Sequence, residues 1–483
     1  MAGQTNSGSE TVTEPARSVP VYRRCNVLVI GGGPAGSAAA ASAARMGADT
    51  VLMERYGHLG GMSTGGFCLW IDRMSDFEGQ QVISGFASDV LDRMPKEALL
   101  GPSSDLWGSR DPELVDYWRQ RAAAFHGVVT WSPTIDSEML KIAHQNEVLD
   151  RGATLLLHAW GVATIQEGNE VRGVIFESKS GRQAILADVV IDTTGDGDIF
   201  AMAGASWDSD IIEDDIHHQM NVAFLWGGVD MERYLQFRDD HREEYQSIME
   251  RARRENVVDR PHVMPRNDQA LFMGPRLSGL SSLSVDDLTV AEVESRRRMQ
   301  EMIGFYKGNM PGFEGAFVSA TAPQMGTRHS RRLTGVERMT ADEWKAGTIF
   351  DDEIGISPPP TPRFANVSMP YGSLVPEQVE NLLAAGRLLS CDAQTHTFMR
   401  EVPNCWAMGQ AAGVAAALSI SGRVRVRDVD VTDLQRELTR QGVPLHSNGA
   451  TTVSPVGSDE GSEVFRSAWE QARATGVADP DPD

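Results

Sequence analysis

The chain has 483 residues, of which 41% are hydrophobic and 23% charged, a composition typical of a globular protein large enough for two or three domains. Its net charge of −23 argues against binding to nucleic acid or to a membrane surface, because phosphate backbones and anionic lipid headgroups would be repelled. No apolar run reaches the roughly 18 to 20 residues that a membrane-spanning helix needs. With four cysteines that lack CxxC spacing, these features predict a cytoplasmic protein in a reducing compartment.

Both ends of the chain are polar. Residues 1–20 are rich in Ser, Thr, Gly and Glu, and residues 448–483 end in the acidic run ADPDPD. Neither segment has an apolar periodicity, so we predict a disordered tail at each end.

The first strongly patterned segment reads as a strand, a glycine-rich turn and a helix. The apolar run RCNVLVI precedes Gly31, Gly33 and Gly36, which have G-x-G-x-x-G spacing, and an alanine-rich helix follows. Such a turn lets a diphosphate approach the positive helix N-terminus. A second strand then ends at Glu54, about 18 residues beyond Gly36, where a carboxylate can accept hydrogen bonds from a ribose. The pattern predicts a site for FAD or NAD, and the carboxylate disfavours NADP.

The remainder of the nucleotide-binding domain is discontinuous. Residues 153–192 read as short strands that close on the buried strand ADVVID, which predicts a β-meander returning to the parallel sheet. We therefore predict an α/β fold in which a Rossmann-like domain comprises residues 21–66, 135–204 and 367–447. The tryptophan-bearing insert 67–134 and the mixed helix-and-loop insert 205–366 are predicted to form a discontinuous α+β cap, or substrate domain, over the cofactor.

Further glycine and carboxylate clusters favour a resident flavin over a visiting nicotinamide. After Glu54, a nicotinamide enzyme would more often continue into another helix, but this chain has a second glycine cluster, RYGHLGGMSTGG. Pro403 then opens a small-residue helix from about Asn404 to Leu418, whose positive end suits the N1/C2=O edge of an isoalloxazine. The chain has no second G-x-G-x-x-G in a βαβ unit, so we expect no dedicated NAD(P)H domain.

Taken together, these motifs resemble the FAD-dependent oxidoreductase family of the glutathione-reductase-like superfamily, which is distantly related to fumarate reductase flavoproteins. The resemblance rests on GGGPAG, LGGMSTGG, IDTTGDGDIFAMAGA, RHSRRLTGVERMTADEW and THTFMREVPNCWAMGQAAG, in that order, and covers residues 20–445. It implies FAD bound across both halves of the nucleotide domain. The FAD contacts that we predict are Gly31, Gly33, Pro34, Ala35, Gly36, Glu54, Arg55, Gly60, Gly61, Met62, Ser63, Thr64, Val162, Thr194, Gly195, Asp196, Gly386, Arg387, Asn404, Cys405 and Gly409.

His396 and Arg400 are the candidate catalytic residues. Their i, i+4 spacing brings both to one face of a helix just before the predicted flavin-binding helix. By resemblance to the fumarate reductases, Arg400 clamps an anionic substrate or polarises its carbonyl, and His396 acts as acid or base. The structural alternative is that His396 bonds a backbone carbonyl and that Arg400 pairs with Glu401.

Arg328 and His218 are further candidates for contact with a substrate. His218 and its neighbour His217 would point to opposite faces of a strand, and no metal-ligand spacing accompanies them, so we predict no metal site. Covalent attachment of flavin through Cys68 or His58 is possible in principle, although a packing role is the more ordinary one for a small buried cysteine.

The leading hypothesis is an FAD-dependent dehydrogenase or oxidase that transfers a hydride from a small organic substrate to flavin N5 and passes the electrons to oxygen or another acceptor. A flavin-dependent monooxygenase is the alternative, although the DG motif of the aromatic hydroxylases is not apparent. A flavin-binding scaffold or lyase without redox turnover is an alternative of another class. The oligomeric state stays open, and a homodimer is one possibility.

Overall fold

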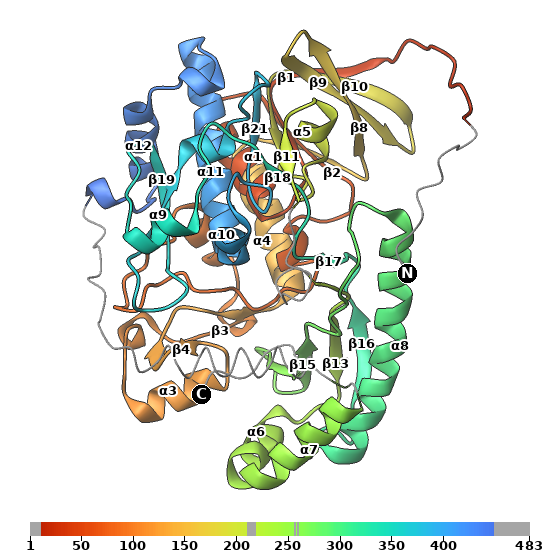
Figure 1. Cartoon of the computed structure of the whole chain (residues 1–483), viewed down its shortest axis with the longest axis vertical. Coiled ribbons are helices and arrows are strands. Elements are labelled where there is room, and N and C mark those ends of the chain that lie inside the picture. Colours follow the sequence, from red (N-terminus) through yellow and green to blue (C-terminus); the bar gives the residue numbers. More distant parts are fainter. Residues whose placement is uncertain (1–10, 210–218, 256, 258–259, 449–483) are drawn as a thin grey trace.

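The computed structural model describes residues 11–209, 219–255, 257 and 260–448 (Figure 1). Most of the two predicted tails, and His218 with its neighbour, lie outside the described residues. No helix in the described part of the chain combines the length and the apolar character that crossing a membrane requires.

A seven-stranded sheet forms the upper part of the molecule in Figure 1. The order along the sheet is β7 (Thr154–Leu157), β2 (Thr50–Glu54), β1 (Val21–Ile30), β10 (Gly181–Asp192), β9 (Glu170–Ser178) and β8 (Trp160–Glu167), and β21 (Leu382–Ala384) also pairs with β10. The pairs that join β7, β2, β1, β10 and β21 are parallel, whereas β8, β9 and β10 form an antiparallel meander. The predicted α/β fold with a meander is therefore confirmed.

The two faces of the sheet follow from the alternation of side chains along β1. Val27 and Val29 belong to a large core that includes α1 (Pro34–Arg45), α4 (Ser137–Asp150) and α11 (Val402–Gly422). Leu28 and Ile30 belong to a second core with the meander and α5 (Asp198–Met202).

Helices α1 and α11 pack at very short range because both have small residues at the contact. A Cβ at Gly409 would lie 2.1 Å from the Ala35 carbonyl oxygen, and one at Gly413 would lie 2.2 Å from that of Ala39. Only glycine fits these two positions of α11. On its other side α11 contacts α12 (Val431–Arg440).

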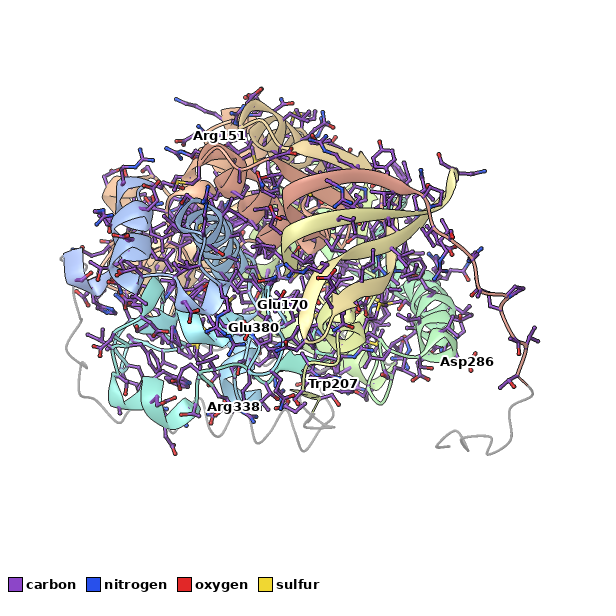
Figure 2. The ribbon with its side chains drawn as sticks, turned by 90° about the horizontal axis from the view of Figure 1, so that it is seen from above. Arg151, Glu170, Trp207, Asp286, Arg338 and Glu380 are labelled. Atoms are coloured by element: carbon purple, nitrogen blue, oxygen red, sulfur yellow. The ribbon has the colours of Figure 1, made fainter. Side chains whose placement is uncertain are left out.

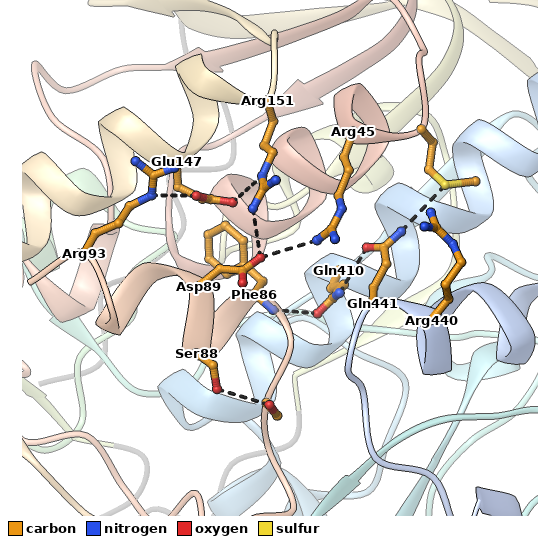
Figure 3. Close-up of polar contacts among 12 residues, drawn as sticks. Arg45, Phe86, Ser88, Asp89, Arg93, Glu147, Arg151, Gln410, Arg440 and Gln441 are labelled. Atoms are coloured by element: carbon orange, nitrogen blue, oxygen red, sulfur yellow. Dashed lines mark hydrogen bonds and ion pairs between the residues drawn. The ribbon is translucent and has the colours of Figure 1, made fainter.

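A polar network joins helices around α2 (Phe86–Leu91), which packs on α4 and α11 (Figure 3). The buried carboxylate of Glu147 binds Arg93 and Arg151, each at 2.6 Å. Gln410 of α11 accepts a hydrogen bond from the Phe86 amide at the start of α2 (2.9 Å). These contacts tie the 67–134 insert to the helices behind the sheet.

The lower part of the molecule is built on a four-stranded antiparallel sheet (Figure 1). Its strands, in order, are β14 (His262–Val263), β15 (Gln269–Phe272), β13 (Phe224–Gly227) and β16 (Phe317–Thr321). Helices α6 (Met231–Asp240), α7 (Arg242–Arg254) and α8 (Val285–Asn309) complete this part, and Trp226 lies fully buried in its separate aromatic core.

Shorter elements connect the two parts. The small strand pairs are β3 (Leu99–Leu100) with β6 (Thr134–Ile135), β4 (Ala124–Phe125) with β5 (Val128–Val129), β11 (Trp207–Asp208) with β18 (Arg332–Leu333), and β19 (Glu353–Ser357) with β20 (Val367–Pro370). The short helices are α3 (Pro112–Arg119), α9 (Ala341–Ala346) and α10 (Ala393–Met399).

The predicted domain boundaries fall within two of these strand pairs. The β3–β6 pair joins residues on either side of position 134, and the β19–β20 pair joins residues on either side of position 366. The division into cap and nucleotide domain therefore stays a prediction. Within the predicted nucleotide domain, Glu170 and Glu380 lie side by side although they are far apart in sequence (Figure 2).

Candidate functional site

The turn between β1 and α1 has an open side that faces away from the sheet. Gly31 has a φ of +102°, and a Cβ there would lie 2.5 Å from the Thr193 carbonyl oxygen. A Cβ at Gly36 would lie 1.7 Å from the Gly31 carbonyl oxygen, so the start of α1 is pressed against the turn. In contrast, a Cβ at Gly33 would meet nothing within 4 Å, and no side chain caps the helix. The first amides of α1 therefore border free space.

Glu54 orients the same turn from the end of β2. Its side chain is buried, Oε2 accepts a hydrogen bond from the Gly32 amide (2.5 Å), and Oε1 accepts one from the Tyr56 amide (2.8 Å). Burial raises the pKa of Glu54, and the two amide bonds oppose this shift. Each oxygen keeps a further lone pair, so the carboxylate can still accept hydrogen bonds from a ribose.

Aromatic and backbone groups gather beside the end of β2. The Arg55 guanidinium lies over the ring of Tyr56 at 5.0 Å and within 5.8 Å of that of Trp160. Close by in sequence, the β8–β9 register shifts between Gly161 and Ala163, so Val162 is the extra residue of a bulge. Its backbone groups are thereby left outside the regular ladder.

The second glycine cluster lies directly against the first turn. The Gly60 amide donates to the Gly32 carbonyl (2.8 Å), and a Cβ at Gly61 would lie 2.8 Å from the Cα of Gly33. The other predicted residues of this cluster lie in or just after a single helical turn, Gly61–Ser63, and they are Met62, Ser63 and Thr64.

The loops after β10 and β21 meet at an ion pair. Asp196 Oδ1 accepts hydrogen bonds from Arg387 Nη2 (2.9 Å) and from Ser282 Oγ (3.2 Å). Burial alone would raise the pKa of Asp196, but the adjacent Arg387 outweighs burial and holds the pKa below its ordinary value. The predicted residues Thr194, Gly195 and Gly386 flank this pair, with Gly386 at a φ of +103°. Ser282 was missed because it comes from the distant 205–366 insert and follows no motif.

Helix α11 begins with polar atoms at its N-terminus. No side chain caps the helix, and Glu401 stands at the N-cap position. Asn404 is 4% exposed, its Nδ2 donates to the Phe398 carbonyl (3.0 Å), and its Oδ1 has no hydrogen-bond partner in the described structure. The Cys405 thiol donates to the Arg400 carbonyl (3.2 Å), and burial raises its pKa to about 12.

A small hollow opens at this helix end. It collects residues from three separate segments, which are Asp72, Arg73, Ser357, Pro358, Phe398, Glu401, Pro403 and Asn404. Asp72 and Arg73 were not predicted, because their segment carries no recognisable motif and only the fold brings it to α11.

His396 is fully buried on α10 and makes the backbone contact that the structural alternative describes. Its Nε2–H donates to the Arg387 carbonyl (2.8 Å), which fixes the tautomer, and its Nδ1 has no partner in the described structure. Burial, followed by the nearby His329 and Arg400, holds the pKa of His396 well below its ordinary value. The ring is therefore neutral, with Nδ1 as an acceptor.

Arg400 caps the C-terminal end of α10 and also makes the predicted alternative contact. Its Nη2 lies 3.3 Å from Oε1 of Glu401, and its side chain is 10% exposed. The expected common face of His396 and Arg400 thus exists in a short helix, and its role in catalysis stays a prediction.

Three segments of the 205–366 insert form a small β-ladder, and two further arginines lie next to it. Met220 in β12 (Met220–Asn221) pairs with Thr327 in β17 (Gly326–Thr327) and, on its other side, with Leu277. Met220 and Leu277 pack against α8. Arg328 follows Thr327 and Arg276 precedes Leu277, so this ladder brings the two arginines into the same region.

Arg328 has the cations Arg276 and Arg400 and the carboxylate of Glu401 among its charged neighbours. Burial, followed by the charges of Arg276 and Arg400, lowers its pKa to about 9. Arg276 escaped the sequence analysis because the register of the ladder, rather than any motif, brings it beside Arg328. Behind them His329 accepts a hydrogen bond from Arg332 (2.8 Å) and lies 5.2 Å from the ring of His396.

The remaining candidates are Cys68 and His58, which were considered for covalent flavin attachment, and His218. Burial raises the pKa of Cys68 to about 12, and its thiol donates to the Trp70 carbonyl. His58 shares a hydrogen bond with Gln324 (3.1 Å), which joins the glycine cluster to the cap. His218 is outside the described residues. Within them, no three His, Cys, Asp or Glu side chains are grouped as a metal site would require.

The chain matches the family described as FAD dependent oxidoreductase over residues 26–438. It belongs to this family. The protein is thus an FAD-dependent oxidoreductase, and its cofactor is FAD. A comparison with curated proteins gave no match.

Several solved structures of flavoproteins are similar to this oxidoreductase. A geranylgeranyl bacteriochlorophyll reductase-like protein from Thermoplasma acidophilum is 13% identical with a TM-score of 0.42, over 87% of this chain and 84% of that one. The p-nitrophenol 4-monooxygenase PnpA from Pseudomonas putida is 11% identical with a TM-score of 0.44, over 94% of this chain and 95% of that one. The flavin-dependent brominase Bmp2 is 11% identical with a TM-score of 0.41, over 94% of this chain and 88% of that one.

The described residues fit FAD at both ends of the cofactor. The free space at Gly33 in front of α1 suits a diphosphate. At the other end, the uncapped start of α11 suits a carbonyl oxygen of the flavin ring. Asn404 Oδ1, which accepts no hydrogen bond in the described structure, can accept one from an N–H group of the ring.

Proposed function

We propose that this FAD-dependent oxidoreductase oxidises a small anionic organic molecule, which binds between the cap ladder and the start of α11. The observation that carries the proposal is the convergence of Arg276, Arg328 and Arg400, whose mutual repulsion contributes to the low pKa of Arg328. Binding of an anion relieves this repulsion and makes charge-assisted hydrogen bonds. When bound, FAD supplies a two-electron acceptor for the hydride of the substrate.

The roles of the surrounding residues follow from their contacts. Arg400 stands at the junction of α10 and α11 and orients the anionic group. His396 offers a neutral acceptor at Nδ1 and positions a hydroxyl or amino group of the substrate by a hydrogen bond. The buried surroundings exclude water and strengthen both contacts.

The first experiment compares carboxylates with their neutral amides as reductants of the purified holoenzyme without air, followed by the flavin absorbance. We expect carboxylates to bleach the flavin and the matched amides to leave it oxidised. Arg400→Ala should keep its FAD and lose about 10²-fold in kcat/KM, because a charge-assisted contact to the substrate is gone. The exposed Arg436 provides the control, and Arg436→Ala should match the parent.

Equal reduction by carboxylates and amides, or normal turnover by Arg400→Ala, would contradict the proposal. Mixing the reduced enzyme with oxygen then separates the electron acceptors. Rapid reoxidation indicates an oxidase when the product gains no oxygen and a monooxygenase when it does. Slow reoxidation indicates a dehydrogenase with another acceptor.

A further inference from the structure

Glu401 stands at the junction of the anion-binding arginines and the hollow at α11. It occupies the N-cap position of α11 without donating or accepting a capping hydrogen bond through its side chain. Its Oε1 lies 3.3 Å from Arg400, and its side chain, 20% exposed, lines the hollow together with Asp72, Arg73 and Asn404. The carboxylate therefore borders both the predicted substrate position and the polar side chains of the hollow.

The charges around Glu401 come from three segments of the chain. The cations are Arg400 beside it, Arg73 across the hollow and Arg328 from the cap, and Asp72 is the neighbouring anion. The thiols of Cys68 and Cys405 also face it. Burial raises the pKa of Glu401, Arg400 opposes the shift and Asp72 adds to it, so that the net pKa lies above the ordinary value.

The other titratable groups of the cluster are poorly suited to accept and release a proton. His396 has its Nε2 bound to a backbone carbonyl and a strongly depressed pKa, so it does not retain a proton at neutral pH. The thiols of Cys68 and Cys405 stay protonated, because burial raises their pKa values to about 12. A carboxyl group whose pKa is raised toward the working pH can both take up and release a proton.

We propose that Glu401 is the catalytic proton acceptor of this enzyme, receiving the proton that a hydroxyl or amino group of the anionic substrate releases during oxidation. The O–H or N–H bond breaks, a double bond to the neighbouring carbon forms, and the hydride of that carbon leaves with its electron pair for FAD. The substrate is thereby oxidised and FAD reduced. Glu401, whose side chain is 20% exposed, then releases the proton to solvent. The inference rests on the proposed function.

The test combines an infrared titration of the resting holoenzyme with the pH dependence of turnover. In the titration we expect a carboxylic-acid carbonyl band that disappears with pH above the ordinary glutamate range. The band should be missing in Glu401→Gln and should shift to lower pH in Asp72→Asn, since Asp72 helps to raise the pKa. The exposed Glu377 is the control, and Glu377→Gln should keep the parental band.

In turnover, kcat/KM of the parent should rise with pH through the same titration, because only the carboxylate accepts a proton. Glu401→Gln should keep its FAD and its affinity for an unreactive carboxylate, lose about 10² to 10⁴-fold in kcat, and lose this pH dependence. A missing infrared band, or a normal rate and pH profile in Glu401→Gln, overturns the inference while the proposed function stands. Failure of every carboxylate to reduce the parent flavin overturns both.

Discussion

Gly33 and Gly36 belong to the same motif, but the residues around them differ. The Cβ of any other residue at Gly36 would collide with the Gly31 carbonyl oxygen at 1.7 Å, whereas at Gly33 it would enter free space. Gly33 also has an extended backbone conformation that any residue adopts, with φ of −67° and ψ of −170°. The fold therefore requires glycine at position 36, and we predict that the ligand requires it at position 33.

This difference predicts opposite behaviour of two valine variants. Gly33→Val should fold with an apoprotein melting temperature within about 2 °C of the parent and fail to retain FAD, because the side chain fills the diphosphate space. Gly36→Val should lose about 3 kcal/mol or more of stability, because α1 has to move away from the turn. Flavin absorbance after gel filtration and thermal melting of the apoproteins measure both effects. Retention of FAD by Gly33→Val would contradict the assignment.

At the residue scale, the sequence located the glycine and charged positions that belong to local motifs, and their contact with FAD stays a prediction. Gly31, Glu54 and the pair formed by Asp196 and Arg387 all lie at ends of parallel strands, where a strand-turn pattern is legible in sequence. The roles of His396 and Arg400 were open between catalysis and structure, and the structure contains the contacts that the structural alternative describes. Tautomer and pKa depend on neighbours from other segments, which no local pattern reveals.

At the scale of elements, the helices around the sheet are held together by a few buried polar groups. The carboxylate of Glu147 on α4 is 2% exposed and binds two arginines that are each about a third exposed. Arg93 also pairs with Asp150, which is 63% exposed. The same guanidinium thus makes one buried and one exposed ion pair. Figure 3 shows the buried pair, with Glu147 between Arg93 and Arg151.

We predict that Glu147→Gln destabilises the protein by about 2 kcal/mol, less than for a fully buried pair because water partly solvates the two arginines. Asp150→Asn should change stability by no more than about 0.5 kcal/mol, since an exposed ion pair contributes little. Urea unfolding of the two apoprotein variants provides the comparison. Equal effects of the two substitutions would show that burial of Glu147 does not matter.

The positions of helices and strands were predictable where apolar periodicity was strong. They were less predictable where the pairing of short strands determines the structure. The strands of the meander and the helix after Pro403 were expected from sequence, although α11 extends beyond its predicted ends to Val402–Gly422. The position of Arg276 could not be predicted from the sequence, because it depends on a two-residue ladder around Met220. Pairs as short as this carry no periodicity, and tertiary packing alone determines them.

At the scale of the whole molecule, buried neutral histidines make stability depend on pH. His144 on α4 is fully buried between Phe86 and Trp406, and neither ring nitrogen has a partner in the described structure. Burial lowers its pKa to about 3. The unfolded chain takes up a proton near pH 6.5, whereas the native state resists until about pH 3, so stability present above pH 6.5 falls as the pH is lowered.

We predict a loss of about 1.4 kcal/mol per pH unit from His144 well below pH 6.5. Urea midpoints of the apoprotein between pH 7 and pH 5 measure the slope, which should be shallower in His144→Leu. The exposed His241 is the control, and His241→Gln should keep the parental slope. An unchanged slope in His144→Leu would contradict the prediction.

The contact between α1 and α11 also bears on how the protein is synthesised. These helices pack with glycine against backbone, yet α11 follows α1 only after roughly 350 residues, which a ribosome adds in roughly 20 to 70 s at about 5 to 20 residues per second. During that interval the alanine face of α1 lacks its native cover. Helix α1 therefore gains this cover only when the last fifth of the polypeptide emerges.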